Sequence, residues 1–350
     1  MAKLWKESAT LILLARNANN AFIHNYNYKV LLFTRTDKTA FMSGSACFPG
    51  GAIDKNDESK KWINHFNKYG ISENQLQQNF KNKGNRPPIF KNNFNAIDRE
   101  ISLRINAIRE TFEEVGVLLC RKKSELDFSK SNGFGNFHEN FDRIKWQEVV
   151  HNDASRFLEL CETLDVVPDV WNLSEWSDWL TPASFSARRF ETAFFIVMLN
   201  TFPNVHGEPH EVKNIYWDTP ERYFDMHKSE KLWIPPPQFY ELKKLSNFHS
   251  IDDIINLVKK RSNEGLTLFL PVNYACKDGM VAVMPGDDMY PDNPNDQTST
   301  ITVEKTMEEF RKTSKNLHRS EYGTFYDTTF HMNIEPLDGY VFPKHKRPKL

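Results

Sequence analysis

The chain has 350 residues, of which 39% are hydrophobic and 13% aromatic, so it can bury a sizeable core, and its length allows two domains. Its 45 basic and 46 acidic residues nearly cancel, which removes any electrostatic argument for a nucleic-acid or membrane-surface partner. The four cysteines, Cys47, Cys120, Cys161 and Cys276, show neither CxxC spacing nor clustering, so we expect reduced thiols of an intracellular protein and no zinc site.

The first two strands are predicted at residues 8 to 15 and 28 to 34, which are dense in apolar side chains. The Asn-rich stretch from 17 to 27 between them has the composition of a hairpin loop. The N-terminal residues are too charged, and their apolar run too short, for a secretory signal. The longest apolar run, 193 to 199, is far below the roughly 18 to 20 residues that span a bilayer, so we expect a soluble protein with no membrane span.

Arg35 stands directly after the second predicted strand. A guanidinium there can bind a phosphate bidentately, although a solvated arginine at a strand end is an equally good interpretation. Farther along, Pro49-Gly50-Gly51 predicts a turn whose bare backbone lets a ligand or metal approach closely, because glycine has no side chain in the way. Taken alone, this tripeptide indicates only a turn.

The segment from about 58 to 94 is long and weakly apolar. Trp62, Phe66 and Tyr69 are spaced by four and three residues, which predicts a short amphipathic helix at its start. The remainder is polar up to Pro87-Pro88. Two interpretations stay open: a flap over a functional site, or a mobile surface excursion.

A stripe of apolar residues predicts a helix from about 95 to 115, and Gly116 supplies its stop. The members of the stripe, spaced by three or four residues, are Ile97, Ile101, Ile105, Ile108, Phe112 and Val115. Near the end of this helix Glu110, Glu113 and Glu114 fall within five residues and project from one wall. A solvated acidic face is the ordinary meaning of such a pattern, and a metal site is the alternative.

A second helix is expected from Trp146 to Leu164, where the apolar residues are imperfectly periodic. A tryptophan-rich run follows, containing Trp171, Trp176 and Trp179. These rings could stack on an adenine, but tryptophans more often serve packing.

A strand dense in aromatic residues is predicted from 190 to 199, directly after Arg188 and Arg189. Adjacent strand side chains point to opposite faces, so at most one of these arginines can meet a substrate phosphate, and we favour Arg189. The stretch from 214 to 224 predicts a further strand, a turn and the start of a helix. Glu211, just upstream, is a candidate for an additional metal ligand or base.

Beyond this point an amphipathic helix is predicted from 248 to 262, with Ser250 as its N-cap. The segments 265 to 272 and 280 to 285 predict two strands that frame a turn around Asp278-Gly279. The acidic stretch from 287 to 296 is expected to be a loop, without the spacing of a metal-binding loop.

Two separated segments, FPGGAIDKND at 48 to 57 and RETFEEVGV at 109 to 117, together resemble the Nudix box, Gx5Ex7REUxEExGU with U an apolar residue. Asp57 is shorter than the glutamate of the box, and Thr111 occupies an apolar slot. Residues 58 to 108, which number 51, separate Asp57 from Arg109 where the box has seven, an excess of 44. The matching positions are Gly51, Asp57 in the place of the first glutamate, Arg109, Glu110, Glu113, Glu114, Gly116 and Val117.

An insertion inside the box is a feature of one branch of the Nudix hydrolase superfamily, the peroxisomal coenzyme A diphosphatases (Nudix hydrolase 19-like). The likeness continues through WLTP at 179 to 182, RRFETAFFI at 188 to 196 and PGDD at 285 to 288. LLFTR followed by FMSGSACFPGG also partly resembles the coenzyme A motif of related diphosphatases. The resemblance therefore covers most of the chain.

This resemblance implies an α/β fold, the Nudix α/β/α sandwich with a mixed sheet, here with an insertion within the box and a C-terminal extension. It implies hydrolysis of the diphosphate of coenzyme A or acyl-CoA to adenosine 3′,5′-bisphosphate and (acyl-)phosphopantetheine, assisted by Mg²⁺ or Mn²⁺. Carboxylate and carbonyl oxygens suit these cations. The residues implied are Glu110, Glu113, Glu114 and the Gly50 carbonyl as metal ligands, Arg109 beside them in catalysis, Arg35 and Arg189 on the substrate, and Glu211 as a possible additional ligand or base.

Two alternatives remain open. The substrate could be another nucleoside diphosphate conjugate, such as ADP-ribose or a dinucleotide. The chain could also be a catalytically inactive nucleotide-binding protein, although the intact Glu110, Glu113 and Glu114 argue against loss of the site.

We expect a Nudix hydrolase domain over residues 8 to 240 and a C-terminal extension over 241 to 350, packed on the same domain and ending in a targeting tail. The last three residues, Pro348, Lys349 and Leu350, resemble the Ser-Lys-Leu peroxisomal address with proline in place of the small first residue. The expected partners are therefore a small-molecule substrate and the peroxisomal import receptor, and the alternative location is the cytoplasm.

Overall fold

The computed structural model describes residues 5–37, 42–80, 84–92, 96–126, 133–185 and 188–335. The predicted targeting tail, Pro348 to Leu350, lies outside these ranges. No helix in the described part of the chain is both long and apolar enough to cross a bilayer.

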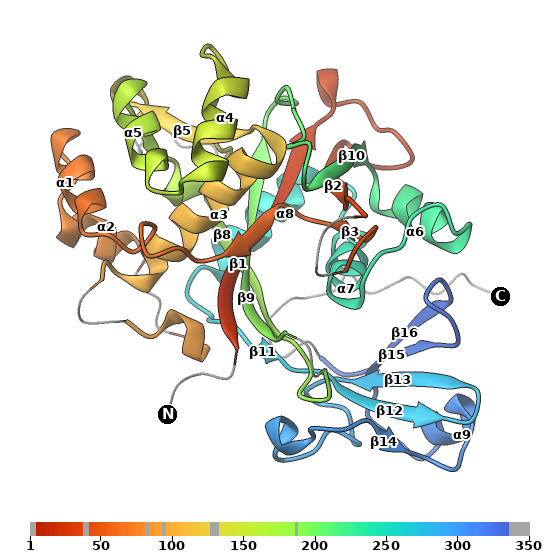
Figure 1. Ribbon diagram of the computed structural model, residues 1–350. Helices are drawn as coiled ribbons and strands as arrows, with labels where there is room; N and C mark the ends of the chain where they lie inside the picture. The colour runs from red at the N-terminus through yellow and green to blue at the C-terminus, as the bar shows by residue number, and fades with distance from the viewer. Residues whose placement is uncertain are drawn as a thin grey trace.

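An eight-stranded mixed sheet forms the centre of the structure (Figure 1). Its order is β10-β2-β1-β9-β8-β11, with β3 paired to β2 and β4 paired to β1. The central strand β1 runs antiparallel to β2 and parallel to β9, which confirms the predicted hairpin of the first two strands. The strands are β1 (Lys6–Arg16), β2 (Tyr28–Arg35), β3 (Ala46–Cys47), β4 (Gly50–Ala52), β8 (Ser174–Leu180), β9 (Phe190–Leu199), β10 (Val212–Asp218) and β11 (Leu268–Phe269).

Both faces of this sheet are buried. Ala9, Leu11 and Leu13 of β1 lie in one apolar cluster, whereas Ile12 and Leu14 lie in another, because successive side chains of a strand point to opposite faces. A strand buried on both faces has a continuous apolar sequence, which explains the unbroken run at the start of the chain.

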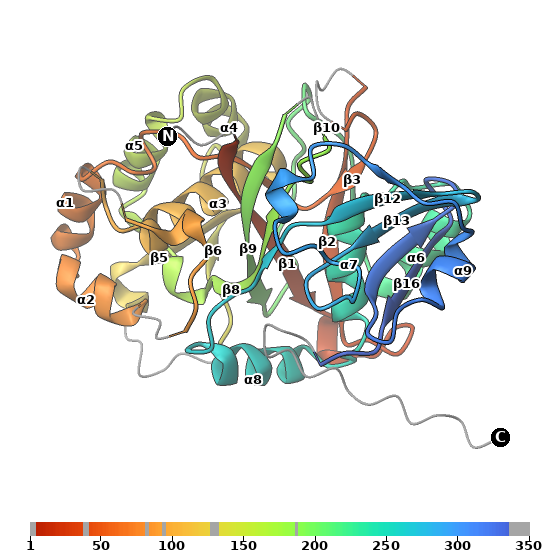
Figure 2. The same cartoon turned by 90° about the horizontal axis from the view of Figure 1, so that it is seen from below.

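Helices cover both faces of the sheet (Figure 2). The first cluster lies under α3 (Arg99–Val115), α4 (Arg143–Asn152) and α5 (Arg156–Thr163), and the second under α6 (Pro220–Lys228), α7 (Pro236–Leu245) and α8 (Ile251–Arg261). This arrangement confirms the expected α/β/α sandwich with a mixed sheet. The predicted N-cap of α8 is also confirmed, since Ser250 Oγ accepts a hydrogen bond from the Asp252 N–H.

The insertion is part of the core over its described residues. It forms α1 (Lys61–Lys68), α2 (Glu73–Asn79) and a short 3-10 turn (Pro88–Phe90), and it buries Trp62, Phe66 and Leu76 in the first apolar cluster. The predicted amphipathic helix is confirmed. A mobile surface excursion is the wrong interpretation for this part, because these side chains are almost inaccessible to solvent.

The single helix predicted from 146 to 164 is two helices, α4 and α5. They separate at Asp153, whose backbone is extended and whose carboxylate accepts a hydrogen bond from the Ser155 N–H at 3.0 Å. Such a local side-chain bond competes with helix formation, and it explains the imperfect periodicity. Nearby, a small three-stranded sheet joins β5 (Leu118–Lys122) to β6 (Phe137–His138) and β7 (Val166–Pro168).

A second sheet of five strands, in the order β14-β12-β13-β15-β16, forms the C-terminal part of the described chain, with α9 (Met307–Arg311) beside it (Figure 1). The predicted turn at Asp278-Gly279 joins β12 to β13, as expected. The strand predicted over 265 to 272 is wrong, because Leu268 and Phe269 pair with β8 of the central sheet while Val272 opens the second sheet. The strands of this sheet are β12 (Val272–Cys276), β13 (Gly279–Val283), β14 (Ile301–Thr302), β15 (His318–Tyr322) and β16 (Thr328–Met332).

Candidate active site

Helix α3 is held firmly at the end that carries the glutamates. It begins at Asp98, whose carboxylate accepts from the Glu100 N–H, and it ends at Gly116, which adopts the left-handed conformation at φ 72°. Groups from elsewhere in the chain satisfy its final carbonyls: Glu113 O accepts from Gln147 Nε2 at 2.8 Å, Glu114 O from the Glu208 N–H at 3.0 Å, and Val115 O from the His206 N–H at 3.0 Å.

Arg109 organises three carboxylates with one guanidinium. It makes a two-point contact with Asp57 at 2.8 and 2.9 Å, and it contacts Glu113 at 2.5 Å and Glu110 at 2.8 Å. Asp57 is only 1% exposed and also accepts from the Asn106 amide at 3.2 Å. The structure therefore places Asp57 in the support of Arg109, not on the face that carries the glutamates.

Glu114 lies farther from a positive charge than Glu110 and Glu113 do. It is 2% exposed, and its Oε2 accepts a hydrogen bond from the Gly50 N–H at 2.7 Å. The nearest positive charge is Arg35, whose guanidinium lies 3.9 Å from Oε1. Burial raises the pKa of Glu114 well above its usual range, against the lowering effect of Arg35.

The Pro-Gly-Gly turn approaches the sheet backbone at Gly50 and the Glu110 side chain of the helix at Gly51. A Cβ on Gly50 would lie 2.4 Å from the Ala9 carbonyl oxygen and 2.6 Å from Thr10 Cα. A Cβ on Gly51 would instead lie 2.4 Å from Glu110 Oε2 and 2.5 Å from its Cδ. The turn thus brings bare backbone against the carboxylates, as the sequence predicts.

The other two glutamates share this electrostatic environment. Burial raises the pKa of Glu110, although the neighbouring Arg109 opposes the rise. Burial likewise raises the pKa of Glu113 to about 8, again against Arg109. A solvated acidic face is the wrong interpretation, because Glu113 and Glu114 are buried and the Glu110 side chain is only 14% exposed.

Thr111, which departs from the apolar slot of the box, is fully buried on the same helix. Its hydroxyl donates to the Ala107 carbonyl at 2.7 Å, one turn earlier. The hydroxyl is thus satisfied within the helix, and the methyl group fills the space of the expected apolar residue.

Arg35 and Glu211 lie beside the glutamates. The two ends meet because β10 pairs with β2 at Val212 and Arg35, and the Thr36 N–H donates to the Glu211 carbonyl at 2.9 Å. Burial is the main cause of the raised pKa of Glu114, and the charge of Glu211 adds to it. The structure therefore brings together Arg35, Glu211, the three glutamates and the glycine turn.

Arg189 lies elsewhere. Its guanidinium donates to the Thr181 carbonyl at 2.9 Å and to Asn295 Oδ1 at 3.2 Å, and it covers the Trp5 ring. Phe190 pairs with Lys6 on β1, whereas Gly50 pairs with Thr10, so about 13 Å of strand separates the two levels. Arg189 is thus not part of the carboxylate cluster, and its neighbour Arg188 is exposed, as expected.

The tryptophans after α5 serve packing. The indole N–H groups of Trp176 and Trp179 donate to the buried carboxylate of Glu241 at 2.6 and 2.7 Å. The nearby Lys244 ammonium lies 3.2 Å from the same carboxylate. These rings belong to the core on the α7 side of the sheet.

Three residues that sequence reasoning missed support the site: Gln147, His206 and Glu208. Nothing in the pattern around Gln147 marks it. His206 and Glu208, however, lie in the polar run HGEPHE just before β10, next to the candidate Glu211. That concentration of polar side chains is the signal that could have found them.

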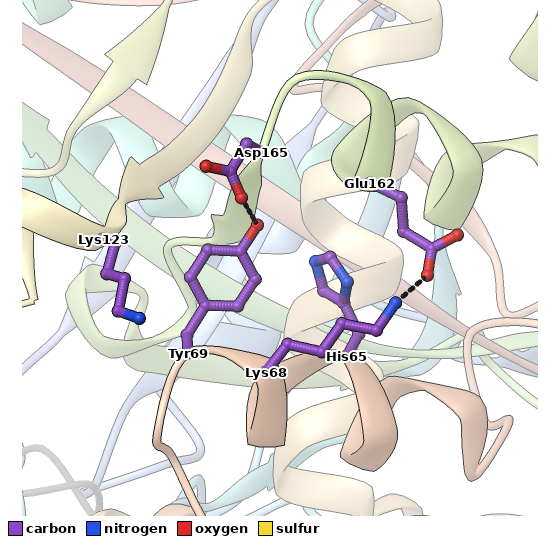
Figure 3. A pocket seen from close by; sticks show the side chains of 6 residues that line it. All are labelled: His65, Lys68, Tyr69, Lys123, Glu162 and Asp165. Carbon is purple, nitrogen blue, oxygen red and sulfur yellow. Dashed lines mark hydrogen bonds and ion pairs between the residues drawn. The ribbon is translucent and has the colours of Figure 1, made fainter.

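Within the described ranges, no three His, Cys, Asp or Glu side chains are grouped so that they could hold a metal ion as they stand. A cavity of about 220 Å³ lies elsewhere, between α1, α5 and the end of β5 (Figure 3). Its lining is polar and already paired in part, since Lys68 contacts Glu162 and the Tyr69 hydroxyl donates to Asp165. None of the residues proposed for catalysis lines it.

The chain is similar to proteins of a known family. Residues 5–245 match the family model described as NUDT19 Nudix domain, and residues 273–333 match the NUDT19 C-terminal domain. The chain is 36% identical to acyl-coenzyme A diphosphatase NUDT19 of Xenopus laevis, covering 91% of this chain and 90% of the relative. It is 33% identical to the protein of the same name from Homo sapiens, covering 91% and 87%.

Among solved structures, a NUDIX hydrolase from Alicyclobacillus acidocaldarius superposes with a TM-score of 0.53 at 19% identity, covering 72% of this chain and 96% of that one. This likeness bears on the fold alone. The two family models and the curated relatives confirm the resemblance carried by the divided Nudix box. The chain belongs to the Nudix hydrolase superfamily, in the NUDT19 family.

Proposed function

We propose that this protein hydrolyses the diphosphate bond of coenzyme A or acyl-CoA, giving adenosine 3′,5′-bisphosphate and (acyl-)phosphopantetheine. Relatives at 36% and 33% identity over most of their length carry the name acyl-coenzyme A diphosphatase. The observation that carries the proposal is the set of three glutamates on α3, the buried Glu113 and Glu114 and the half-buried Glu110, packed against the bare Gly50-Gly51 backbone. A site of this kind, which is rich in oxygen atoms and has more carboxylates than positive charges, suits a diphosphate with a divalent cation.

The residues present fit Mg²⁺ or Mn²⁺ by their chemistry. The buried carboxylate of Glu114 accepts from a peptide N–H and lies 3.9 Å from a guanidinium, and a buried charge needs a close counter-charge. Carboxylate and carbonyl oxygens are the donors that these hard cations take. Glu110, Glu113, Glu114 and the Gly50 carbonyl would hold the cation, which when bound neutralises phosphate charge and lowers the pKa of a water.

The role proposed for Arg109 is to position the carboxylates of the site. Because it holds Asp57, Glu110 and Glu113 at once, its guanidinium fixes the directions of the carboxylates that face the cation. In the reaction the water oxygen forms a bond to one phosphorus, and the bond from that phosphorus to the bridging oxygen breaks. The proton of the water passes to a carboxylate of the cluster, for which Glu211 is the candidate base.

Two arginines are proposed to bind substrate at different distances from the reacting bond. Arg35, beside Glu114, would bind a phosphate oxygen of the diphosphate. Arg189, about 13 Å away along β1, would contact a remote part of a long substrate such as the nucleotide or the pantetheine arm.

The proposal extends to location. We propose that the protein works in the peroxisome and reaches it through an import receptor that binds Pro348, Lys349 and Leu350. The support is the resemblance of this tripeptide to a peroxisomal address together with membership of the family.

The test is a panel of diphosphates at fixed Mg²⁺, and then at fixed Mn²⁺. Free coenzyme A, an acyl-CoA, ADP-ribose and a dinucleotide are compared by kcat/KM, with identification of the products. We expect the highest value for coenzyme A or its ester, with adenosine 3′,5′-bisphosphate as one product. A higher kcat/KM for ADP-ribose or the dinucleotide would overturn the substrate assignment, and no turnover of any member would overturn the enzyme assignment.

A further inference from the structure

We propose that Glu208 is a positioning residue that sets Glu211 beside Glu114 and Arg35; this inference rests on the proposed function of that site. Glu208 lies in the loop between β9 and β10 and is 6% exposed. It does not face the glutamates of α3 with its carboxylate. Its contacts are instead with backbone groups of the helix end and of its own loop.

The first step is the attachment of this loop to α3. The Glu208 N–H donates to the Glu114 carbonyl at 3.0 Å, and the His206 N–H donates to the Val115 carbonyl at the same distance. Gln147 adds a further connection, because its amide donates to the carbonyls of both Glu113 and His206 at 2.8 Å. These hydrogen bonds fix the position of the loop relative to the helix that carries the carboxylates.

The second step is the turn that Glu208 closes. Its carboxylate Oε2 accepts from the N–H groups of both His210 and Glu211 at 2.8 Å. Its carbonyl accepts from the Val212 N–H at 2.9 Å, where β10 begins. Hydrogen bonds from peptide groups to a buried carboxylate are stronger than neutral ones, so this side chain fixes the backbone of the two residues that follow Pro209.

The third step is the effect of the turn on the position of Glu211. The His210 carbonyl meets the Thr36 hydroxyl at 2.7 Å and the Glu211 carbonyl meets the Thr36 N–H at 2.9 Å, directly after Arg35. Glu211 is half-buried there, and its charge acts on Arg35, Glu110 and Glu114. Removing the Glu208 carboxylate would free the Glu211 backbone and move its charge out of the cluster.

The experiment compares the full-length protein with Glu208→Ala, Glu208→Gln, Glu211→Gln and the Glu208→Ala/Glu211→Gln double variant. We measure kcat with acyl-CoA, the Kd for Mn²⁺ without substrate, and amide exchange over residues 206 to 212. Glu162→Ala, a change to an exposed glutamate on α5, is the matched control.

We expect Glu208→Ala to lower kcat about tenfold or more, a change worth about 1.4 kcal/mol, to weaken Mn²⁺ binding, and to speed exchange of the His210 and Glu211 amides. Glu208→Gln keeps an acceptor oxygen in place and should restore most of all three. In the Glu211→Gln background the Glu208→Ala change should have little further effect, because the residue acts through Glu211.

Losses that add in the double variant, unchanged amide exchange in Glu208→Ala, or a Glu208→Gln variant as impaired as Glu208→Ala would each overturn the inference. A wild-type protein that leaves acyl-CoA intact would overturn the proposed function instead. In that case the Mn²⁺ and exchange measurements still decide the role of Glu208, since neither depends on the substrate.

Discussion

At the scale of single residues, the main feature of the site is how its carboxylates are paired with Arg109 and Arg35. Arg109 serves Asp57, Glu110 and Glu113, and Arg35 approaches Glu114 only at 3.9 Å. Glu113 and Glu114 are buried, so ionising them without a bound cation destabilises the folded protein. Residues kept under such strain are typical of sites that bind a ligand.

Glu114→Gln should separate function from stability. The amide oxygen can still accept from the Gly50 N–H, but the charge that a cation needs is gone, so we expect kcat to fall by orders of magnitude. The folded-state pKa of Glu114 is raised, so the folded wild type holds a proton that the unfolded chain releases above about pH 4.3. Metal-free wild type should therefore lose stability as pH rises from there, and it should lose it more steeply than the variant, which keeps only the raised pKa values of Glu110 and Glu113.

Melting curves of both metal-free proteins between pH 4 and 8, with kinetics on the same samples, check this prediction. The Tm difference in favour of the variant should widen as pH rises. Glu148→Gln, which changes an exposed carboxylate on α4, serves as the control and should alter neither kcat nor the slope of Tm against pH. A well-folded Glu114→Gln protein with near-native kcat at saturating Mg²⁺ would refute the assignment.

Substitution of the two glycines of the turn by alanine should have different effects on kcat and Tm. In Gly51→Ala the new Cβ meets only the end of the Glu110 side chain, which can swing away, so we expect a large fall in kcat with little change in Tm. In Gly50→Ala it meets the backbone of Ala9 and Thr10, which cannot move without distorting β1, so Tm should fall clearly. Differential scanning fluorimetry measures the two Tm values, and steady-state kinetics measures kcat. Equal effects of the two changes on Tm would contradict this account.

At the scale of elements, the insertion within the Nudix box contributes to the core. Helix α1 places Trp62 and Phe66 in the same apolar cluster as α3 and the central sheet. Arg99 at the start of α3 adds ion pairs to Glu58 at 2.5 Å and to Glu7 at 2.6 Å, which connect the insertion, the helix and β1. The described part of the insertion thus supports the helix that carries the catalytic candidates.

Phe66→Ala should accordingly destabilise the whole protein. Phe66 is fully buried and packs its ring against Trp171 with centroids 5.8 Å apart. Truncating such a side chain costs about 3–5 kcal/mol of unfolding free energy, because the cavity is only partly refilled. Denaturant unfolding measures this, and Phe22→Ala, at a side chain 60% exposed, should change the same quantity by less than about 0.5 kcal/mol. A negligible effect of Phe66→Ala would restore the view of the insertion as a surface excursion.

At the scale of the whole molecule, the chain after α7 returns to the central sheet before it forms the second one. Helix α8 packs on the second apolar cluster and β11 joins the edge of the central sheet beside β8. The five-stranded sheet then follows, with its own small core around Val281, Val283 and Phe310. The predicted boundary at 240 and 241 falls inside α7, and the division into a Nudix domain and a C-terminal extension stays a prediction.

Localisation should depend on the end of the chain. A fluorescent protein carrying residues 340 to 350 at its C-terminus should co-localise with a peroxisomal marker, because the import receptor binds a terminal tripeptide. Deleting Pro348, Lys349 and Leu350 should disperse the signal. Cytosolic fluorescence from the intact tail would exclude this address while leaving the enzymatic proposal untouched.

The sequence by itself determined much of the secondary structure and most of the candidate site. Apolar periodicity predicted β1, β2, α1, α3 and α8, because burial on one or both faces fixes which positions must be apolar. The spacing of Glu110, Glu113 and Glu114 and the glycines at 50 and 51 predicted a carboxylate face against bare backbone. Periodicity could not foresee the break at Asp153 or the switch of sheets at Pro271, which depend on single side-chain bonds and on the strand that each segment meets.

Only the tertiary structure decided how the charges are paired. Whether Asp57 faces a ligand or Arg109, and whether Arg189 joins Arg35, depends on strand register and on contacts between residues far apart in the chain, which no local pattern encodes. The same holds for Gln147, whose amide contact at the end of α3 carries no sequence signature, and for the backbone contacts of His206 and Glu208, which the polar run HGEPHE marks but does not place. Local propensity specifies helices and strands, whereas the electrostatics of a buried site follow from which elements the fold packs together.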